Sequence, residues 1–323
     1  MPISTPTKLD SQSEQGTTVP QPNASAQPIG VPARRFAVFI VVLLGAYALP
    51  LYQLARHSLE NQLWSHVLLV PWISLYFVWL KRRQIPPAIS SFSRYAAIPL
   101  LLAVGVTAAL AMKFGGSGLA VADYLSLTAL SFVLFLIAGV AWIFGPARAR
   151  ALAFPLAFLF FMVPFPGFLT HAIEVFFQHA SADAASLMFG VSQTPVLRDG
   201  LFFKLPGITI EVAEECSGIR STLGLFITSI IGGYLFFRRK SHRTIIALAI
   251  VPIAIVRNGF RIFTIAMLCV HVSPDMIYSW VHKRGGPIFF ALSLIPFFAL
   301  LIYLYRRERT KQPESGERSQ SVN

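Results

Sequence analysis

The residue types best suited to covalent chemistry in this chain are a cysteine, two arginines and a histidine in three separate segments. Cys216 lies among charged and polar residues at the start of an apolar run, in the sequence EECSGIRS. If a helix begins there, its free amide groups and its dipole favour the thiolate, which is the reactive form of cysteine. Arg220 adds a cation one helical turn further on, whereas Glu214 and Glu215 oppose this effect. Cys216 is therefore the candidate nucleophile.

The arginines and the histidine follow the cysteine along the chain. Arg257 and Arg261 are spaced i, i+4 in an apolar run, so they share one helical face, with Asn258 beside them. We expect Arg257 to be structural and Arg261 to stabilise an oxyanion. The alternative for Arg261 is contact with a lipid headgroup. His282 suits general acid–base chemistry near neutral pH. The alternative is that His282 is only a solvated loop residue. His66 is the next candidate for a functional role among the histidines.

The remaining patterns argue against a metal or a cofactor. Only two cysteines are present, and Cys269 stands in the apolar sequence MLCV, as expected for a small core residue. The chain has no HExxH motif, no paired CxxC and no acidic cluster. It also has neither a GxSxG nucleophile elbow nor a GxxxxGK[ST] phosphate-binding loop. We predict no metal and no cofactor, and leave open whether Cys216 and Cys269 pair.

The segments that carry these residues are typical of membrane helices. Hydrophobic residues make up 55% of the chain and charged residues only 13%, against about 25% charged in a soluble domain. The apolar runs reach about the 20 residues that a helix needs to cross hydrocarbon, where unpaired backbone groups are not tolerated. We predict an all-α integral membrane protein with a bundle of about eight transmembrane helices, at approximately 36–54, 63–80, 95–113, 122–143, 150–165, 219–237, 244–268 and 286–305.

The net charge of +13 is placed mainly between the apolar runs. This placement is typical of topology signals in cytoplasmic loops and not of a nucleic-acid surface. The basic clusters that occupy every second gap or terminus are Arg34-Arg35, Lys81-Arg82-Arg83, Arg148 with Arg150, Arg238-Arg239-Lys240 and Arg306-Arg307. Both termini are therefore predicted to be cytoplasmic, in an inner (cytoplasmic) membrane, with Cys216, Arg261 and His282 meeting on the extracytoplasmic side.

Three regions differ from the spans in composition. Residues 1–33 are rich in Ser, Thr, Gln and Pro, so we predict disordered cytoplasmic tails at 1–33 and 309–323 around a transmembrane domain at 34–308. Residues 167–190, before the sixth span, place apolar residues at helical spacing among polar ones, which predicts an amphipathic helix. Residues 194–212 contain the turn pairs Asp199-Gly200 and Pro206-Gly207, which predict a small extracytoplasmic strand-like segment.

Three of these segments together resemble the exosortase/archaeosortase family. The resemblance lies in EVAEECSGIRS (Glu211–Ser221), in PIAIVRNGFRI (Pro252–Ile262), and in His282 followed by Gly285-Gly286. The segment LWSHVLLVPWISLYFVWLKRR (Leu63–Arg83) is also similar to an early segment of that family. The resemblance covers roughly residues 36–305, and the cysteine motif is its most specific part.

The resemblance implies a membrane-embedded cysteine peptidase or transpeptidase. Its partners would be proteins with a C-terminal sorting signal, which comprises a short Pro-containing motif, a transmembrane helix and a basic tail. The implied catalytic residues are Cys216, Arg261 and His282, although Glu215 stands where the family pattern has a small residue. The residues that we take as supporting or substrate-binding are Glu215, Ser217, Gly218, Arg220, Arg257, Asn258 and His66. The alternative is a transporter or lipid-handling protein that binds an anionic group through Arg257 and Arg261.

Overall fold

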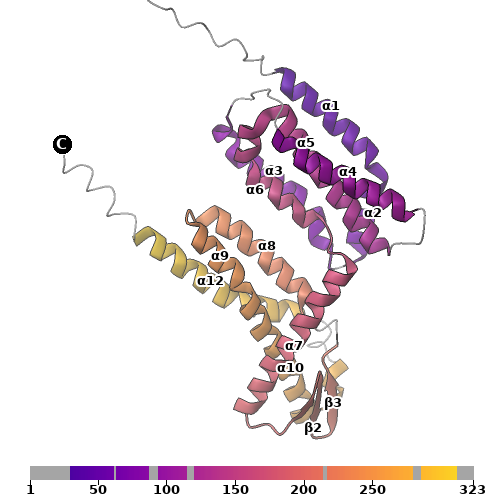
Figure 1. The fold of residues 1–323 in the computed structure, drawn as a ribbon. Coiled ribbons are helices and arrows are strands. Elements are labelled where there is room, and N and C mark those ends of the chain that lie inside the picture. The colour runs from indigo at the N-terminus through magenta and orange to yellow at the C-terminus, as the bar shows by residue number, and fades with distance from the viewer. Residues whose placement is uncertain are drawn as a thin grey trace, which may run out of the picture.

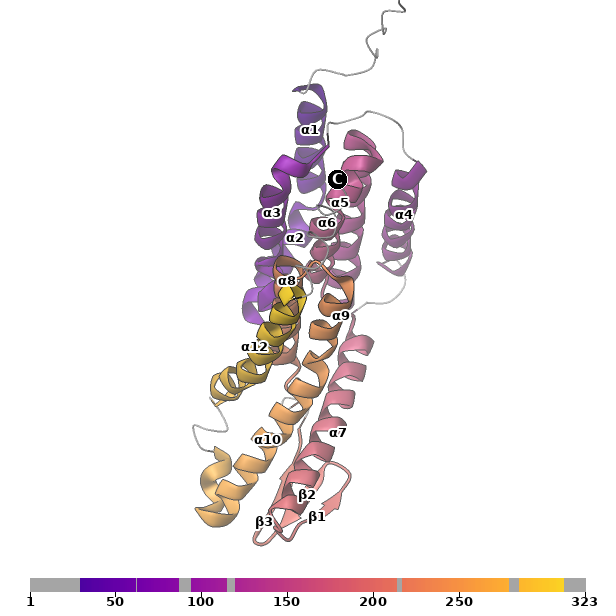
Figure 2. The same cartoon turned by 90° about the vertical axis from the view of Figure 1, so that its left-hand side faces the viewer.

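The computed structural model describes residues 30–61, 63–86, 94–114, 120–213, 217–278 and 285–310, and these residues are mostly helical (Figure 1; Figure 2). The first part of the chain forms short and long helices that lie together in both views. They are α1 (Gly30–Ala46), α2 (Ala48–Glu60), η1 (Ser65–Leu68), α3 (Val70–Lys81), η2 (Arg82–Gln84), α4 (Arg94–Phe114), α5 (Val121–Ala151), α6 (Ala153–Phe158) and η3 (Leu159–Met162).

The second part of the chain contains the longer apolar helices that follow the cysteine motif and a small sheet. Its elements are α7 (Gly167–Val191), β1 (Leu197–Asp199), β2 (Phe202–Leu205), β3 (Ile208–Glu211), α8 (Ile219–Phe236), α9 (Lys240–Leu248), α10 (Ile250–His271), η5 (Pro274–Tyr278) and α12 (Gly286–Thr310). The helical part extends a few residues into both predicted tails, since α1 begins at Gly30 and α12 ends at Thr310. Residues 1–29 and 311–323 lie outside the described residues.

The chain is a multi-pass membrane protein. Among the described residues, four helical segments are long and apolar enough to cross a membrane, namely α5, α8, the continuous run Lys240–His271 and α12. Two bent pairs raise the number to six if each counts as one span. They are α1 with α2, bent by 67°, and α6–η3 with α7, bent by 87°. The predicted number of about eight spans stays a prediction.

Three of the predicted spans are not single long helices, and the first of them, 36–54, is divided between α1 and α2 by the 67° bend. Residues 63–80 contain η1 and the 12-residue helix α3, which is shorter than the roughly 20 residues that cross hydrocarbon. Residues 150–165 contain α6 and η3, after which the chain passes through Pro164 and Pro166 into α7. Proline has no N–H to donate to a helix ladder, so these prolines end the helix at the position of the 87° bend.

Buried side chains form three apolar clusters, and α8 contributes to two of them. The first cluster joins α1, α2, α3, α5 and α6 and includes Leu223 and Ile227 of α8. The second joins α7, the sheet and α10. The third joins α9, α10 and α12 and includes Leu225 of α8. Because α8 packs into both the first and the third cluster, its position is fixed from two sides.

The predicted strands are present as a three-stranded antiparallel sheet in the order β1-β2-β3. Its two turns contain Gly200 (φ +60°) and Gly207 (φ +82°), backbone conformations that glycine adopts without steric cost. Phe203, Leu205 and Ile210 are buried and pack the sheet against α7 and α10. Both views place the sheet at the end of these two helices that is distant from α9 (Figure 1; Figure 2).

The helices α7 and α10 lie side by side because a glycine allows their backbones to approach closely. α7 occupies the predicted amphipathic segment almost residue for residue. A Cβ atom added at Gly259 of α10 would lie 2.7 Å from Ala184 Cβ and 3.1 Å from the carbonyl oxygen of Ser181, both in α7. Gly259 stands between Arg257 and Arg261, so this contact also fixes how deeply both arginines sit.

A methyl group at Gly259 is therefore expected to separate the two helices. We expect Gly259→Ala to lower the thermal unfolding midpoint in detergent, because overpacking against backbone typically costs about 1–3 kcal/mol. The matched control is Gly105→Ala in α4, where an added Cβ meets nothing within 4 Å. That variant should be neutral or slightly stabilising, since alanine is favoured over glycine in a helix by about 1 kcal/mol. Equal midpoints for the two variants would contradict the close contact.

Candidate active site

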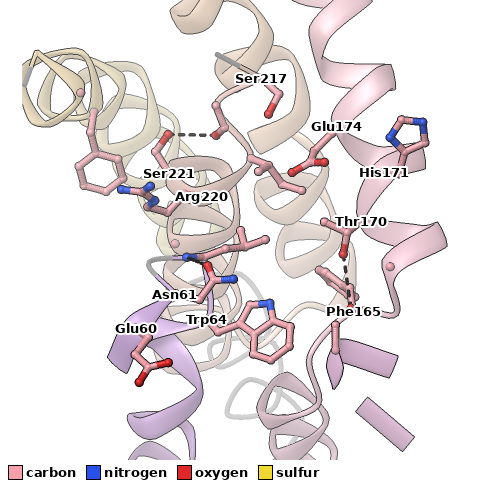
Figure 3. A pocket seen from close by; sticks show the side chains of 18 of the residues that line it. Glu60, Asn61, Trp64, Phe165, Thr170, His171, Glu174, Ser217, Arg220 and Ser221 are labelled. Atoms are coloured by element: carbon pink, nitrogen blue, oxygen red, sulfur yellow. Dashed lines mark hydrogen bonds between the residues drawn. The ribbon is translucent and has the colours of Figure 1, made fainter. Parts of the chain in front are cut away.

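A cavity of about 1240 Å³ lies where the start of α8 meets α2, α7, α10 and α12. In Figure 3, Glu60, Asn61 and Trp64 belong to the end of α2 and the turn after it, while Phe165 and Glu174 belong to the chain entering α7 and to α7 itself. The lining residues are His57, Glu60, Asn61, Leu63, Trp64, Ala122, Phe165, Gly167, Thr170, His171, Glu174, Ser217, Gly218, Ile219, Arg220, Ser221, Gly224, Arg261, Gly286, Pro287 and Phe290.

The backbone at the start of α8 is shaped around Gly218. This residue is the N-cap of α8 and has φ +73° and ψ 12°, in the left-handed region. A Cβ atom at this position would lie 2.7 Å from Arg257 Nη2 and 3.1 Å from Asn258 Oδ1. Glycine is therefore required at residue 218 for two reasons, namely the left-handed backbone conformation and the close approach of α10.

The carbonyl oxygen of Gly218 is surrounded by four donors. The backbone N–H and the hydroxyl of Thr222 donate to it at 3.1 Å and 2.9 Å, and the hydroxyl of Ser221 donates at 3.0 Å. Arg257 of α10 donates through Nη2 at 3.2 Å and also contacts Thr222 Oγ1 at 3.4 Å. These bonds join the start of α8 to α10 and fix the orientation of the first peptide group of the helix.

The chain is also held on the other side of the cysteine motif. Val212, just after β3, is 1% exposed and donates its N–H to the carbonyl oxygen of Leu201 at 3.0 Å. The carbonyl oxygen of Val212 accepts a hydrogen bond from the buried side-chain amide of Gln178 in α7. Val212 is therefore hydrogen-bonded to α7, and Gly218 is hydrogen-bonded to α10.

The structure brings several of the predicted site residues together at this cavity. Arg261, Ser217, Gly218 and Arg220 line it. Arg257 is not a lining residue. It is 7% exposed and packs behind Gly218, and the role expected for it stays a prediction.

Asn258 and His66 lie outside the cavity lining. Asn258 is 2% exposed and lies close to Gly218 on the side of α10. His66 lies in η1, outside the candidate spans, where its Nδ1 donates to the carbonyl oxygen of Leu63 at 3.1 Å. Burial lowers the pKa of His66, and the hydrogen bond to Leu63 holds the ring against the local turn.

Three of the predicted residues lie outside the described part of the chain, namely Cys216, Glu215 and His282. Their described neighbours are part of the cavity wall. Ser217 follows Cys216 directly, and Gly286 is the first lining residue after His282. The other cysteine, Cys269, is 2% exposed among apolar side chains of α10, α7 and the sheet, as predicted from its sequence.

The individual residues of α2 and α7 that form the walls of the cavity were not among the site residues predicted from the sequence. Along α7, Gly167, Thr170, His171 and Glu174 line it at spacings of three and four residues, which is one face of a helix. His57, Glu60 and Asn61 repeat the same spacing at the end of α2. This periodicity of polar residues was the available signal. The wall contains both carboxylates and guanidinium groups, a mixture that suits a polar peptide segment. Among the described residues no group of three His, Cys, Asp or Glu side chains is placed to hold a metal ion.

Replacing Gly218 should disturb the site more than the same change at other left-handed glycines. We expect Gly218→Ala to destabilise the protein by about 2–4 kcal/mol, because backbone strain adds to the clash with Arg257. The control is Gly207→Ala in the sheet, which has φ +82° but open space around the added Cβ. It should cost only about 1 kcal/mol, from strain alone. The measurement is thermal or denaturant unfolding in detergent, and an equal loss in both variants would contradict the role of the clash.

The whole cavity falls within one family match. The family model described as transmembrane exosortase matches residues 57–299. The match begins at His57, the first lining residue of the cavity, and extends beyond Phe290, the last one. Comparison with curated proteins and with solved structures gave no match.

Proposed function

Because this chain belongs to the transmembrane exosortase family, we propose that it is a cysteine-dependent membrane peptidase or transpeptidase. It would act at the extracytoplasmic face of the inner membrane on proteins that carry a C-terminal sorting signal, made of a Pro-containing motif, a transmembrane helix and a basic tail. The observation that carries this proposal is that Arg261 and the two residues after Cys216 line a single cavity within the helix bundle.

Covalent geometry supports a place for Cys216 beside this cavity. Consecutive Cα atoms are about 3.8 Å apart, and the neighbouring Ser217 is a lining residue. The polar walls contributed by α2 and α7 offer hydrogen-bond partners for the extended peptide motif. The transmembrane helix of the client would remain in the bilayer next to the bundle, with its basic end on the cytoplasmic side.

The proposed chemistry is acyl transfer in two steps. The thiolate of Cys216 attacks the carbonyl carbon of the scissile peptide, and the C=O electrons move to the oxygen, whose charge Arg261 stabilises. When the tetrahedral intermediate collapses, the C–N bond breaks, His282 gives a proton to the departing amine, and a thioester remains on Cys216. An amine or water then attacks the thioester and releases the acyl group from the sulfur.

The decisive experiment compares the two cysteines of the chain. We expect Cys216→Ala to abolish processing of a co-expressed client chosen from the same proteome for its Pro-containing motif, apolar helix and Arg-rich tail. Processing is measured as a shift of the client protein to lower mass on a gel. The control, Cys269→Ala, should retain processing, because Cys269 is buried away from the cavity. A Cys216→Ala or Cys216→Ser variant that processes the client normally would overturn the nucleophile assignment and favour a binding or transport role.

The mass of the released client distinguishes hydrolysis from transfer. A new C-terminus that ends in a free carboxylate means that water takes the acyl group, whereas an added moiety means that an amine or another nucleophile does. We expect an added moiety in cells, and a free carboxylate for the purified enzyme in detergent without an acceptor. Intact-mass spectrometry of the mature client measures both outcomes, and a free carboxylate in cells would reduce the proposal to a peptidase.

A further inference from the structure

One polar side chain in the cavity wall has no partner among the residues that the structure describes. Ser217 is 1% exposed and lines the cavity, and its Oγ makes no hydrogen bond to the described part of the chain. Buried hydroxyl groups almost always have a hydrogen-bond partner, so the Ser217 hydroxyl in the cavity wall is available to donate to a bound molecule. Figure 3 shows the Ser217 side chain among the residues around the cavity, with Glu174 on the facing helix α7.

The first peptide group of α8 points toward the same region. Four donors hold the Gly218 carbonyl oxygen toward the body of α8 and toward α10. A trans peptide is planar, so the N–H of Ile219 is directed opposite to this carbonyl, away from the helix and toward the chain that precedes it. The N-cap residue, Gly218, has no side chain to cap this end of α8, and the N–H groups of a first helical turn have no partners within the helix.

We propose that the Ser217 hydroxyl and the first amide groups of α8 form the oxyanion site for the acyl-transfer reaction. This inference rests on the proposed function and adds a catalytic residue to it, since the Ser217 hydroxyl would touch the reacting carbonyl oxygen. The amide groups stand at the positive end of the helix dipole, which favours the negative charge that develops on that oxygen. Arg257 is then a positioning residue, because it holds the peptide group whose N–H donates.

The step involves a hydrogen bond and no additional proton transfer. As the Cys216 sulfur bonds to the carbonyl carbon, the carbonyl oxygen gains the electron pair and accepts hydrogen bonds from Ser217 Oγ and from the α8 amides. When the C–N bond breaks, the electron pair returns to the C=O bond and the leaving amine takes its proton from His282. The Ser217 hydroxyl keeps its own proton throughout. Arg261, which lines the same cavity, supplies long-range positive charge to the oxyanion.

The chain offers a matched pair of serines to test this assignment. Ser181 in α7 is also fully buried, and its Oγ makes no hydrogen bond to any described residue, but Ser181 does not line the cavity. Removing one oxyanion donor typically lowers kcat by about 10²-fold. We therefore expect Ser217→Ala to lower the single-turnover rate of client cleavage by about 10²-fold with little change in KM, Ser217→Thr to recover much of the rate, and Ser181→Ala to match the unmodified protein.

A peptide aldehyde gives a second readout that does not depend on turnover. An aldehyde that carries the client's Pro-containing motif adds to a thiol to form a hemithioacetal, whose oxygen occupies the oxyanion site, whereas the corresponding peptide alcohol cannot. Ser217→Ala should weaken binding of the aldehyde about 10-fold or more and leave binding of the alcohol unchanged. Ser181→Ala should change neither. Competition against client cleavage, or calorimetry with the purified protein, measures both affinities.

The possible outcomes separate this inference from the function on which it rests. If Cys216→Ala is inactive while Ser217→Ala cleaves the client and binds the aldehyde as the unmodified protein does, the oxyanion assignment is wrong and the proposed function stands. If Ser217→Ala and Ser181→Ala lose rate equally, the effect is one of packing and the assignment is also wrong. If Cys216→Ala cleaves normally, the proposed function itself fails.

Discussion

A buried guanidinium that needs an acceptor organises the centre of this molecule. A cation removed from water without a partner costs several kcal/mol, and Arg257 is 7% exposed inside a membrane helix. It meets this requirement through the carbonyl oxygen of Gly218 at the start of α8. The contact demands a residue without a Cβ at 218, and Gly259, two residues further along α10, permits a separate close approach of α10 to α7. Together the two contacts fix α10 against both α8 and α7.

The cavity follows from that arrangement. α8 packs against the first part of the chain through Leu223 and Ile227 and against the last helices through Leu225. The N-terminus of α8 therefore lies where these two parts of the chain meet. The two walls carry polar residues from α2 and α7, and Arg261 completes the cavity from α10. An enzyme that acts on a membrane-anchored client needs such a polar space within an apolar bundle, because peptide bonds are poorly solvated in lipid.

The sequence predicted the membrane class, the extent of α7 and the strands near 197–211 well, since each depends on local periodicity or turn residues. It also predicted that Cys269 is buried among apolar side chains, because a small apolar residue inside an apolar helix usually packs in the core. It was less successful with the helix ends within spans 36–54, 63–80 and 150–165, because hydropathy does not sense a break between two apolar helices, such as the one that Pro164 and Pro166 impose after η3. The individual residues of α2 that line the cavity and the environment of Ser217 could not be predicted, because both depend on which helix faces meet in three dimensions.

The two anchors around the cysteine motif have a mechanical consequence. Gln178 of α7 holds the chain at Val212, Arg257 of α10 holds it at Gly218, and these two helices touch almost backbone to backbone at Gly259. The distance between the two anchor points, Val212 and Gly218, is therefore set by the closely packed pair α7 and α10, through one buried side chain from each helix. The number of residues between the two anchors should consequently tolerate less variation than their identity, so that an insertion there would be more damaging than most substitutions.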